Sequence, residues 1–281
     1  MFLLIPLYFF LGQTLPTVLF HGLGDSCSWS MLKSFFSDIN ADCIEIGSGP
    51  SSSILLGFLD QAKDACVKVQ EKYAGQTINV VGLSQGALIG RYIITDCDLK
   101  GGRVSKYLSI GGPQMGVSVI PHCNSYLCWP LNKVVDSLVY TDYVQQHIGP
   151  AGYFRNHEDL DSYLKYNHFL PDLNNERNPE CSRKSKVQLN ISVQFSSLDQ
   201  VMLVKFLQDE MVLPKESAFF ESVDPETDKV VPLVESEFYI QDYIGVKQLD
   251  QQRKIKFIEI DDSHLKWTDD ITKNVFIPFL V

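Results

Sequence analysis

The sequence of 281 residues predicts a single domain of the α/β class, with a mainly parallel central sheet and helices on both of its faces. Short apolar runs rich in Val and Ile alternate along the chain with longer segments whose apolar residues recur at helical spacing. The length is ample for one such domain with an insertion and borderline for two domains. We therefore assign residues 15–281 to one domain.

The overall composition is that of an ordinary globular protein, with 45% hydrophobic and 21% charged residues. The formal net charge of -10 argues against nucleic acid or an anionic membrane surface as a partner. No internal repeat is present, and no segment after the N-terminus is long and apolar enough to predict a transmembrane helix.

The N-terminal segment MFLLIPLYFFLG is almost wholly apolar, which is typical of a signal peptide, and we predict one at residues 1–14. No Lys or Arg lies near Met1, so a buried first strand is the alternative. Seven cysteines and the glycosylation sequon at Asn190 agree with export. These signals predict a protein of the lysosome or one that is secreted.

The elements before residue 75 follow from apolar spacing. Residues 17–25 read as a buried strand that ends in a glycine-containing loop, and residues 29–39 read as a helix. Residues 43–47 are typical of a short strand. Residues 51–73 have helical spacing, with serines to cap the start of the helix.

The segment INVVGLSQGALIGRY, residues 78–92, carries the most informative motif. Its apolar run predicts a strand, its second half predicts a helix, and Ser84 lies at the junction between Gly82 and Gly86. The two glycines let neighbouring backbones approach closely. G-x-S-x-G between a strand and a helix is typical of the nucleophile turn of the α/β-hydrolases, so Ser84 is a candidate nucleophile.

The remainder of the chain completes the predicted sheet. Residues 103–113 read as a strand, and from about 111 to 186 the alternation lapses in a way that predicts a largely helical, substrate-binding insertion. Residues 201–212 contain a strand-like run that ends at Asp209, and residues 254–267 contain a strand followed at once by His264. Residues 271–281 are predicted to form a helix.

A serine nucleophile needs a base and an acid, and chain order identifies candidates. In α/β-hydrolases the order is serine, acid, histidine, with each residue on a loop after a strand. Ser84, Asp209 and His264 occur in this order and at such positions. His21 also follows a strand but precedes the serine. Other carboxylates that could act as the acid are Glu210, Asp199, Asp224, Asp261 and Asp262.

An oxyanion hole for this chemistry needs two backbone N–H donors. One is expected from Gln85, the residue after the nucleophile, and the other from Leu23 in the loop after the first strand. His21 is expected to pack in that loop or to hydrogen-bond within it. The segment CNSYLC favours a local disulfide between Cys123 and Cys128, with a zinc site that includes His122 as the alternative.

With these residues assigned, the chain resembles the palmitoyl-protein thioesterases, lysosomal enzymes that remove fatty acyl groups from cysteine thioesters. The resemblance runs from about residue 16 to the C-terminus and implies the same triad, Ser84, Asp209 and His264, with oxyanion donors at Leu23 and Gln85. It is carried by the segments HGLGDSC, GLSQGALIGRYI, SIGGPQMGV, IPHCNSYLC, FLPDLNNER, VKFLQDEMVLPKESAFF, FYIQDYIGVKQLD and DDSHLKW.

The resemblance further implies a groove for a long acyl chain, no cofactor and no metal, and S-acylated proteins or peptides as partners. It implies the disulfides Cys66–Cys97 and Cys123–Cys128. Two positions depart from the family pattern. Ala87 replaces a glycine, and Cys27-Ser28 replaces two adjacent cysteines, so Cys27 is free or paired elsewhere, with Cys43 as a candidate. Cys181 is then the odd cysteine.

The sequence therefore supports a serine hydrolase that cleaves long-chain acyl thioesters through an acyl-enzyme at Ser84. Two alternatives stay open. The same scaffold could serve a lipase or carboxylesterase acting on oxygen esters, or a non-catalytic lipid-binding homologue of such hydrolases.

Overall fold

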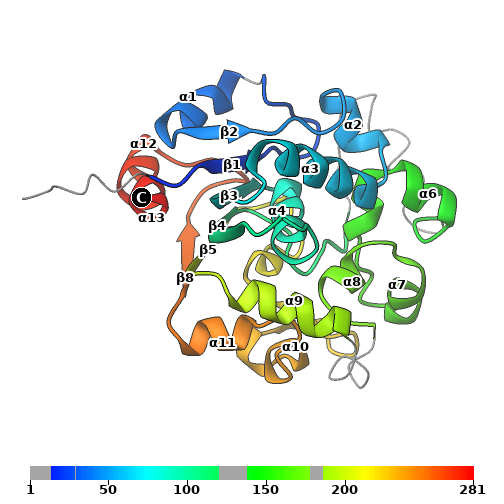
Figure 1. The fold of residues 1–281 in the computed structure, drawn as a ribbon. Coiled ribbons are helices and arrows are strands. Elements are labelled where there is room, and N and C mark those ends of the chain that lie inside the picture. The colour runs from blue at the N-terminus through cyan, green and yellow to red at the C-terminus, as the bar shows by residue number, and fades with distance from the viewer. Residues whose placement is uncertain (1–13, 29, 120–137, 178–185) are drawn as a thin grey trace, which may run out of the picture.

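The central sheet of the protein is wholly parallel. The computed structural model describes residues 14–28, 30–119, 138–177 and 186–281. Within these residues, six strands pair in the order β2-β1-β3-β4-β5-β8 (Figure 1). Their bounds are β1 Thr17–Phe20, β2 Ala41–Cys43, β3 Thr77–Leu83, β4 Arg103–Ile110, β5 Gln200–Phe206 and β8 Ile255–Ile260.

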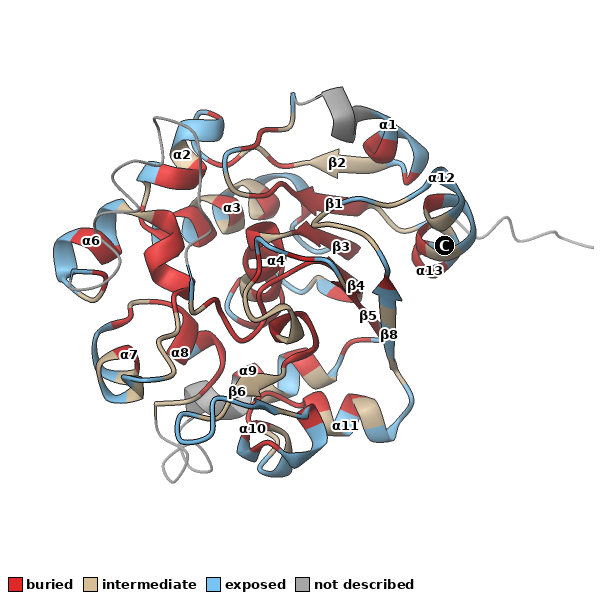
Figure 2. Ribbon diagram, turned by 180° about the vertical axis from the view of Figure 1, so that it is seen from behind, coloured by how far each residue is buried: buried red, intermediate tan, exposed pale blue. Residues whose placement is uncertain are grey.

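Helices cover both faces of this sheet, as predicted, because alternate strand residues point to opposite faces. Val18 and Val80 belong to a core cluster that contains the buried side chains of α3 (Phe58–Tyr73) and α4 (Gln85–Thr95). Their neighbours Leu19 and Val81 belong to a second cluster, with residues of α1 (Ser30–Asp38) and α13 (Ile277–Leu280). Figure 2 shows buried residues along the inner strands and α4, whereas the edge strands β2 and β8 are mostly intermediate or exposed.

The helix predicted at residues 51–73 is two helices, α2 (Pro50–Leu55) and α3. The break lies at Gly57, whose N–H donates a hydrogen bond of 3.0 Å to the carbonyl of Gln146. A Cβ at Gly57 would lie 2.6 Å from that carbonyl oxygen. A contact with a distant segment therefore ends α2, which the local spacing of apolar residues could not reveal.

The strand predicted at 43–47 was wrong in its bounds, because β2 covers Ala41–Cys43. Its register pairs Thr17 with Ala41, and Leu19 with Cys43. Ile44 and Ile46 are buried beyond the end of the strand. The N–H of Ile44 still donates a 2.9 Å hydrogen bond to the carbonyl of Leu19 in β1, and pairing with β1 ends there.

The segment predicted as a helical insertion, 111–186, contains short helices where it is described. They are α6 (Asp142–His147), a 3-10 turn at Gly149–Tyr153, α7 (Leu160–Tyr166) and α8 (Leu170–Leu173). Figure 1 shows them together on one side of the sheet, away from α13. The limits of the insertion stay a prediction, and the predicted signal peptide lies, except for Thr14, outside the described residues.

The remaining elements flank β5 and β8. Helix α9 covers Lys186–Ser196, α10 covers Glu237–Ile240 and α11 covers Val246–Gln251. The strands β6 (Ser222–Val223) and β7 (Val230–Val231) form a small antiparallel pair. Further 3-10 turns cover Lys215–Phe219 and Leu233–Glu235. The chain ends, as predicted, in helical structure formed by α12 (Asp269–Ile271), a π-helical turn (Thr272–Phe276) and α13.

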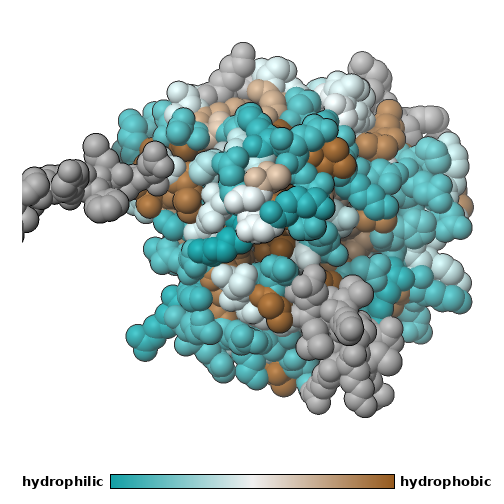
Figure 3. Space-filling view, viewed as in Figure 1, coloured by the Kyte–Doolittle hydropathy of each residue, from teal (hydrophilic) through white to brown (hydrophobic). Residues whose placement is uncertain are grey.

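The face of the protein in Figure 3 is mostly hydrophilic, with hydrophobic side chains in small scattered groups. No helix in the described part of the chain combines the length and the apolar character needed to cross a membrane.

Candidate active site

Ser84 lies on a strained turn between β3 and α4. Its φ of 52° and ψ of -126° are unusual for a residue with a side chain. The glycines on either side permit this turn. A Cβ at Gly82 would lie 2.2 Å from the Cα of Ala87, and one at Gly86 would lie 2.3 Å from the carbonyl oxygen of Phe20. Only glycine fits at either position, so close packing holds Ser84 in its conformation.

The side chains of Ser84, His264 and Asp209 form a connected row. His264 Nε2 lies 3.0 Å from Ser84 Oγ, and His264 Nδ1 lies 2.7 Å from Asp209 Oδ2. The Asp209 side chain is 2% exposed and that of His264 is 11% exposed. Charge-assisted hydrogen bonding is stronger where water is largely excluded, so this carboxylate is well placed to fix the orientation of the imidazole.

Asp209 and His264 follow neighbouring strands, and hydrogen bonds hold their loops together. The other carboxylate oxygen of Asp209 accepts hydrogen bonds from the N–H groups of Met211 and Val212, at 2.8 and 2.9 Å. The N–H of Gln208 donates to the carbonyl of Asp262 at 3.1 Å. These bonds close the Asp209 loop on itself and attach it to the segment that carries His264.

The other carboxylates considered from the sequence have different surroundings. Asp199 lies at the opposite end of the sheet, where its hydrogen bond with Arg103 lowers its pKa. Asp224 stabilises a turn through Thr227, and that hydrogen bond lowers the pKa of Asp224. Asp261 accepts a hydrogen bond from the side-chain amide of Gln208, and Asp262 accepts one from the N–H of Ser263. Glu210 is exposed.

The two predicted oxyanion donors lie on segments next to Ser84. Gln85 is the first residue of α4, so its N–H is not used within the helix. Leu23 lies in the loop after β1, and this loop passes close to the nucleophile, since a Cβ at Gly22 would lie 3.2 Å from the Cβ of Ser84. Both residues are thus on backbone that borders the serine.

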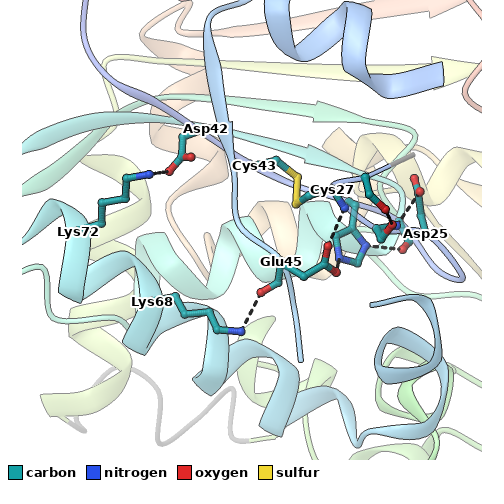
Figure 4. The surroundings of a disulfide bond; sticks show 11 residues. Asp25, Cys27, Asp42, Cys43, Glu45, Lys68 and Lys72 are labelled. Atoms are coloured by element: carbon teal, nitrogen blue, oxygen red, sulfur yellow. Dashed lines mark hydrogen bonds and ion pairs between the residues drawn. A yellow bond between two sulfur atoms is a disulfide. The ribbon is translucent and has the colours of Figure 1, made fainter. Parts of the chain in front are cut away.

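His21 and a disulfide hold the start of this loop (Figure 4). The fully buried imidazole of His21 has Nδ1 3.0 Å from the carbonyl oxygen of Gly22 and Nε2 3.1 Å from Glu45 Oε1. The other oxygen of Glu45 accepts a 2.8 Å hydrogen bond from the N–H of Cys27, which forms a disulfide with Cys43. His21 therefore orders the loop, as expected, although Glu45 was not foreseen.

A buried polar cluster behind the site was also missed. It contains Ser53, Gln61 and Tyr153, which lie on α2, on α3 and in the 3-10 turn Gly149–Tyr153, and it includes the side chain of Gln85. The serines near residue 51 are predicted from the sequence to cap the start of a helix. The residue before α2 is Gly49, and no side chain caps this helix. No local pattern in the sequence marks Ser53 or Gln61 as partners of the nucleophile turn.

The predicted disulfide between Cys66 and Cys97 is present, and it joins α3 to the segment just after α4. Cys123, Cys128, Cys181 and the alternative zinc ligand His122 lie outside the described residues, while Asn190 lies in α9 with its side chain outside the description. Among the described residues, no group of three or more side chains suited to a metal ion comes together.

A cavity of about 660 Å³ lies within the segment predicted as the insertion. Its lining combines apolar side chains with hydroxyl and charged groups, among them Val139, Phe154, Tyr140 and Glu158. Neither Ser84 nor His264 lines this cavity. The acyl groove implied by the family resemblance therefore stays a prediction.

A parallel sheet with helices on both faces, a serine at a strained strand-to-helix turn and an imidazole between that serine and a carboxylate define an α/β-hydrolase. The chain belongs to the palmitoyl protein thioesterase family, whose model matches residues 16–264. The resemblance recognised in the sequence is thus confirmed.

Individual relatives and one solved structure are similar over most of the chain. Palmitoyl-protein thioesterase 1 of Caenorhabditis elegans is 29% identical, over 94% of this chain and 93% of that protein. The lysosomal thioesterase PPT2 homolog of Drosophila melanogaster is 28% identical, over 79% of this chain and 74% of that protein. The crystal structure of Paleococcus ferrophilus monoacylglycerol lipase has 11% identity and a TM-score of 0.48, over 94% of this chain and 93% of that one.

Proposed function

We propose that this chain hydrolyses long-chain fatty acyl thioesters, such as palmitoyl-cysteine in proteins or peptides, through an acyl-enzyme at Ser84. The observation that carries the proposal is the distance of 3.0 Å between His264 Nε2 and Ser84 Oγ, with Asp209 on the other ring nitrogen. Family membership supports the substrate class.

In the acylation step, neutral His264 takes the proton of Ser84 as Oγ attacks the thioester carbonyl carbon. Asp209 keeps the proton of the imidazole on Nδ1, so that Nε2 is free to act as the base. When the tetrahedral intermediate collapses, the C–S bond breaks and the cysteine leaves as a thiolate. The proton on His264 is then available to the departing sulfur.

In the deacylation step, His264 removes a proton from a water molecule, which attacks the acyl carbon of the ester at Ser84. The bond to Ser84 Oγ breaks, the serine regains its proton, and the fatty acid is released. In both steps the N–H groups of Leu23 and Gln85 would stabilise the negative oxygen, each contributing about 3 kcal/mol to the lowering of the barrier.

A thioester suits this site because a cysteine thiol, with a pKa of about 8.5, is far more acidic than an alcohol. A thiolate therefore needs less protonation as it leaves. The two described disulfides, Cys27–Cys43 and Cys66–Cys97, support an oxidising compartment and so agree with a lysosomal or secreted protein. Residues 1–14 are proposed as its signal peptide and residues 15–281 as one domain.

The test compares thiol release from a palmitoyl-cysteine peptide with hydrolysis of the matched oxygen ester. We expect faster cleavage of the thioester and loss of activity in Ser84→Ala. Preferred cleavage of the oxygen ester would favour a lipase or carboxylesterase. Labelling of the wild type but not Ser84→Ala by a fluorophosphonate is also expected. No labelling of the folded wild type would favour a non-catalytic homologue, and full activity in Ser84→Ala would overturn the proposal.

A further inference from the structure

We infer that Ser53 is a positioning residue that holds the two oxyanion donors at a fixed distance from each other. The inference rests on the proposed function, because it concerns the same site. Ser53 lies in α2, outside the segments that carry Ser84, Asp209 and His264, and it is fully buried. Its hydroxyl contacts the loop that contains Leu23, and its carbonyl contacts the side chain of Gln85.

The hydroxyl of Ser53 holds the loop that contains Leu23. Its Oγ accepts a hydrogen bond of 2.7 Å from the N–H of Gly24, the residue directly after Leu23. The same hydroxyl donates its one hydrogen to the carbonyl of Pro50, also at 2.7 Å. Because that hydrogen is committed to Pro50, the lone pairs of Oγ remain available to Gly24.

The carbonyl of Ser53 holds the other donor residue. It accepts a hydrogen bond of 3.2 Å from the side-chain amide of Gln85, and one of 3.1 Å from that of Gln61. The amide oxygen of Gln85 accepts a hydrogen bond of 3.0 Å from the hydroxyl of Tyr153. The Gln85 side chain is thus held from both ends.

One residue therefore connects the loop after β1 with the first residue of α4. The cluster is buried, with Gln61 fully inaccessible and Gln85 1% exposed. In such surroundings an unsatisfied polar group is costly, so the bonds strongly favour a single arrangement. An oxyanion hole depends on this precision, since its donors act only where the charge develops.

The test replaces Ser53 with alanine, which removes the partner of the Gly24 N–H and leaves the carbonyl of residue 53 in place. We expect kcat for the palmitoyl-cysteine peptide to fall between about tenfold and about a hundredfold, with KM changed less than threefold. Binding of a palmitoyl trifluoromethyl ketone, which forms a tetrahedral adduct with Ser84, should weaken by the same factor. Inhibition by palmitate, which carries no such centre, should weaken less than binding of the ketone.

Ser105→Ala is the matched control. Ser105 is also a buried serine with a hydrogen-bonded hydroxyl, which donates to Asp199 at 2.7 Å, but it lies in β4 at the opposite end of the sheet. The Ser105→Ala variant should be less stable than the wild type but should not show the selective loss of ketone binding. If Ser53→Ala does not fold, Ser53→Cys retains the shape with a weaker acceptor and should show the same selective loss to a smaller extent.

The outcomes separate this inference from the proposed function. A folded Ser53→Ala or Ser53→Cys with unchanged kcat and ketone affinity would overturn the inference while the thioesterase activity of the wild type stood. Equal weakening of ketone and palmitate binding would also overturn it, because it would indicate a general disturbance of the site. Absence of thioesterase activity in the wild type would instead refute the proposed function.

Discussion

The two sides of the proposed active site are held in place by different means. On the serine side, the backbone fixes the nucleophile, because Gly82 and Gly86 allow atoms of neighbouring segments to come closer than any Cβ would permit. On the acid–base side, Asp209 and His264 stand on loops after β5 and the edge strand β8, and hydrogen bonds between those loops bring them together.

The two sides should therefore tolerate different substitutions. The serine side should be sensitive to added volume, since its geometry depends on close backbone contacts. The acid–base side should be sensitive to the pattern of donors and acceptors, since its geometry depends on the carboxylate of Asp209.

Asp209→Asn should lower kcat for the thioester by about 10⁴-fold while the fold is retained. The oxygen of the amide can still accept from the N–H groups of Met211 and Val212. Its NH₂ group would face Nδ1 of His264 and favour the tautomer that protonates Nε2, which removes the base from Ser84. Steady-state rates and a thermal melt check this. Activity within tenfold of wild type would mean that another group orients the histidine.

Gly86→Ala should destabilise the protein by about 3 kcal/mol, because the added methyl would lie 2.3 Å from the carbonyl oxygen of Phe20 and 2.5 Å from that of His21. These are backbone atoms, so the strand or the helix must move. Equilibrium unfolding in urea measures the loss. A variant with unchanged free energy of unfolding would contradict the view that close packing holds the turn.

Removal of the Cys66–Cys97 disulfide should cost about 3 kcal/mol of stability, because a link across 31 residues restricts the unfolded chain. The bond braces the far end of α4, away from Ser84, so kcat should change little. Unfolding of a Cys66→Ala, Cys97→Ala double variant measures the first effect, and rates at a temperature well below its melting point measure the second. A large fall in kcat there would show that the bond also supports the site.

Asp96→Asn should raise the melting temperature at pH 7 slightly. Asp96 is exposed, but desolvation by the surrounding protein raises its pKa above its ordinary value of 3.8, despite a hydrogen bond from Thr95, so the effect should be small. The folded state therefore holds the proton more tightly, so the native protein gains stability as the pH falls from that raised pKa to 3.8. The advantage of the variant should disappear below pH 3.8. A lower melting temperature for Asp96→Asn at pH 7 would mean that the charge is stabilising.

Much of the fold and the order of the site residues could be predicted because they depend on short segments. The motif around Ser84 combines a strand, a tight turn and a helix in fifteen residues, and short apolar runs identified β3, β5 and β8. Asp209 and His264 were predicted from chain order, since loops after parallel strands open at the same edge of the sheet.

The rest depended on contacts between distant segments. Glu45, Ser53 and Gln61 carry no motif. The roles of Glu45 and Ser53 arise where the segment after β2 and helix α2 approach the loop after β1, and that of Gln61 arises where α3 approaches the start of α4. The division of the helix at Gly57 arises from Gln146, which is 89 positions later in the chain. Such contacts form only in the folded protein, so the spacing of residues along the chain does not reveal them.

Ser84 is proposed to carry the acyl group between the two chemical steps. Mass spectrometry of the intact protein, quenched in acid during turnover of a palmitoyl-cysteine peptide, can detect this acyl-enzyme. We predict that a species heavier by one palmitoyl group forms transiently in the wild type, that digestion maps it to Ser84, and that Ser84→Ala never forms it. A palmitoyl group mapped to a different residue, or thioester turnover at the wild-type rate in Ser84→Ala, would contradict the claim.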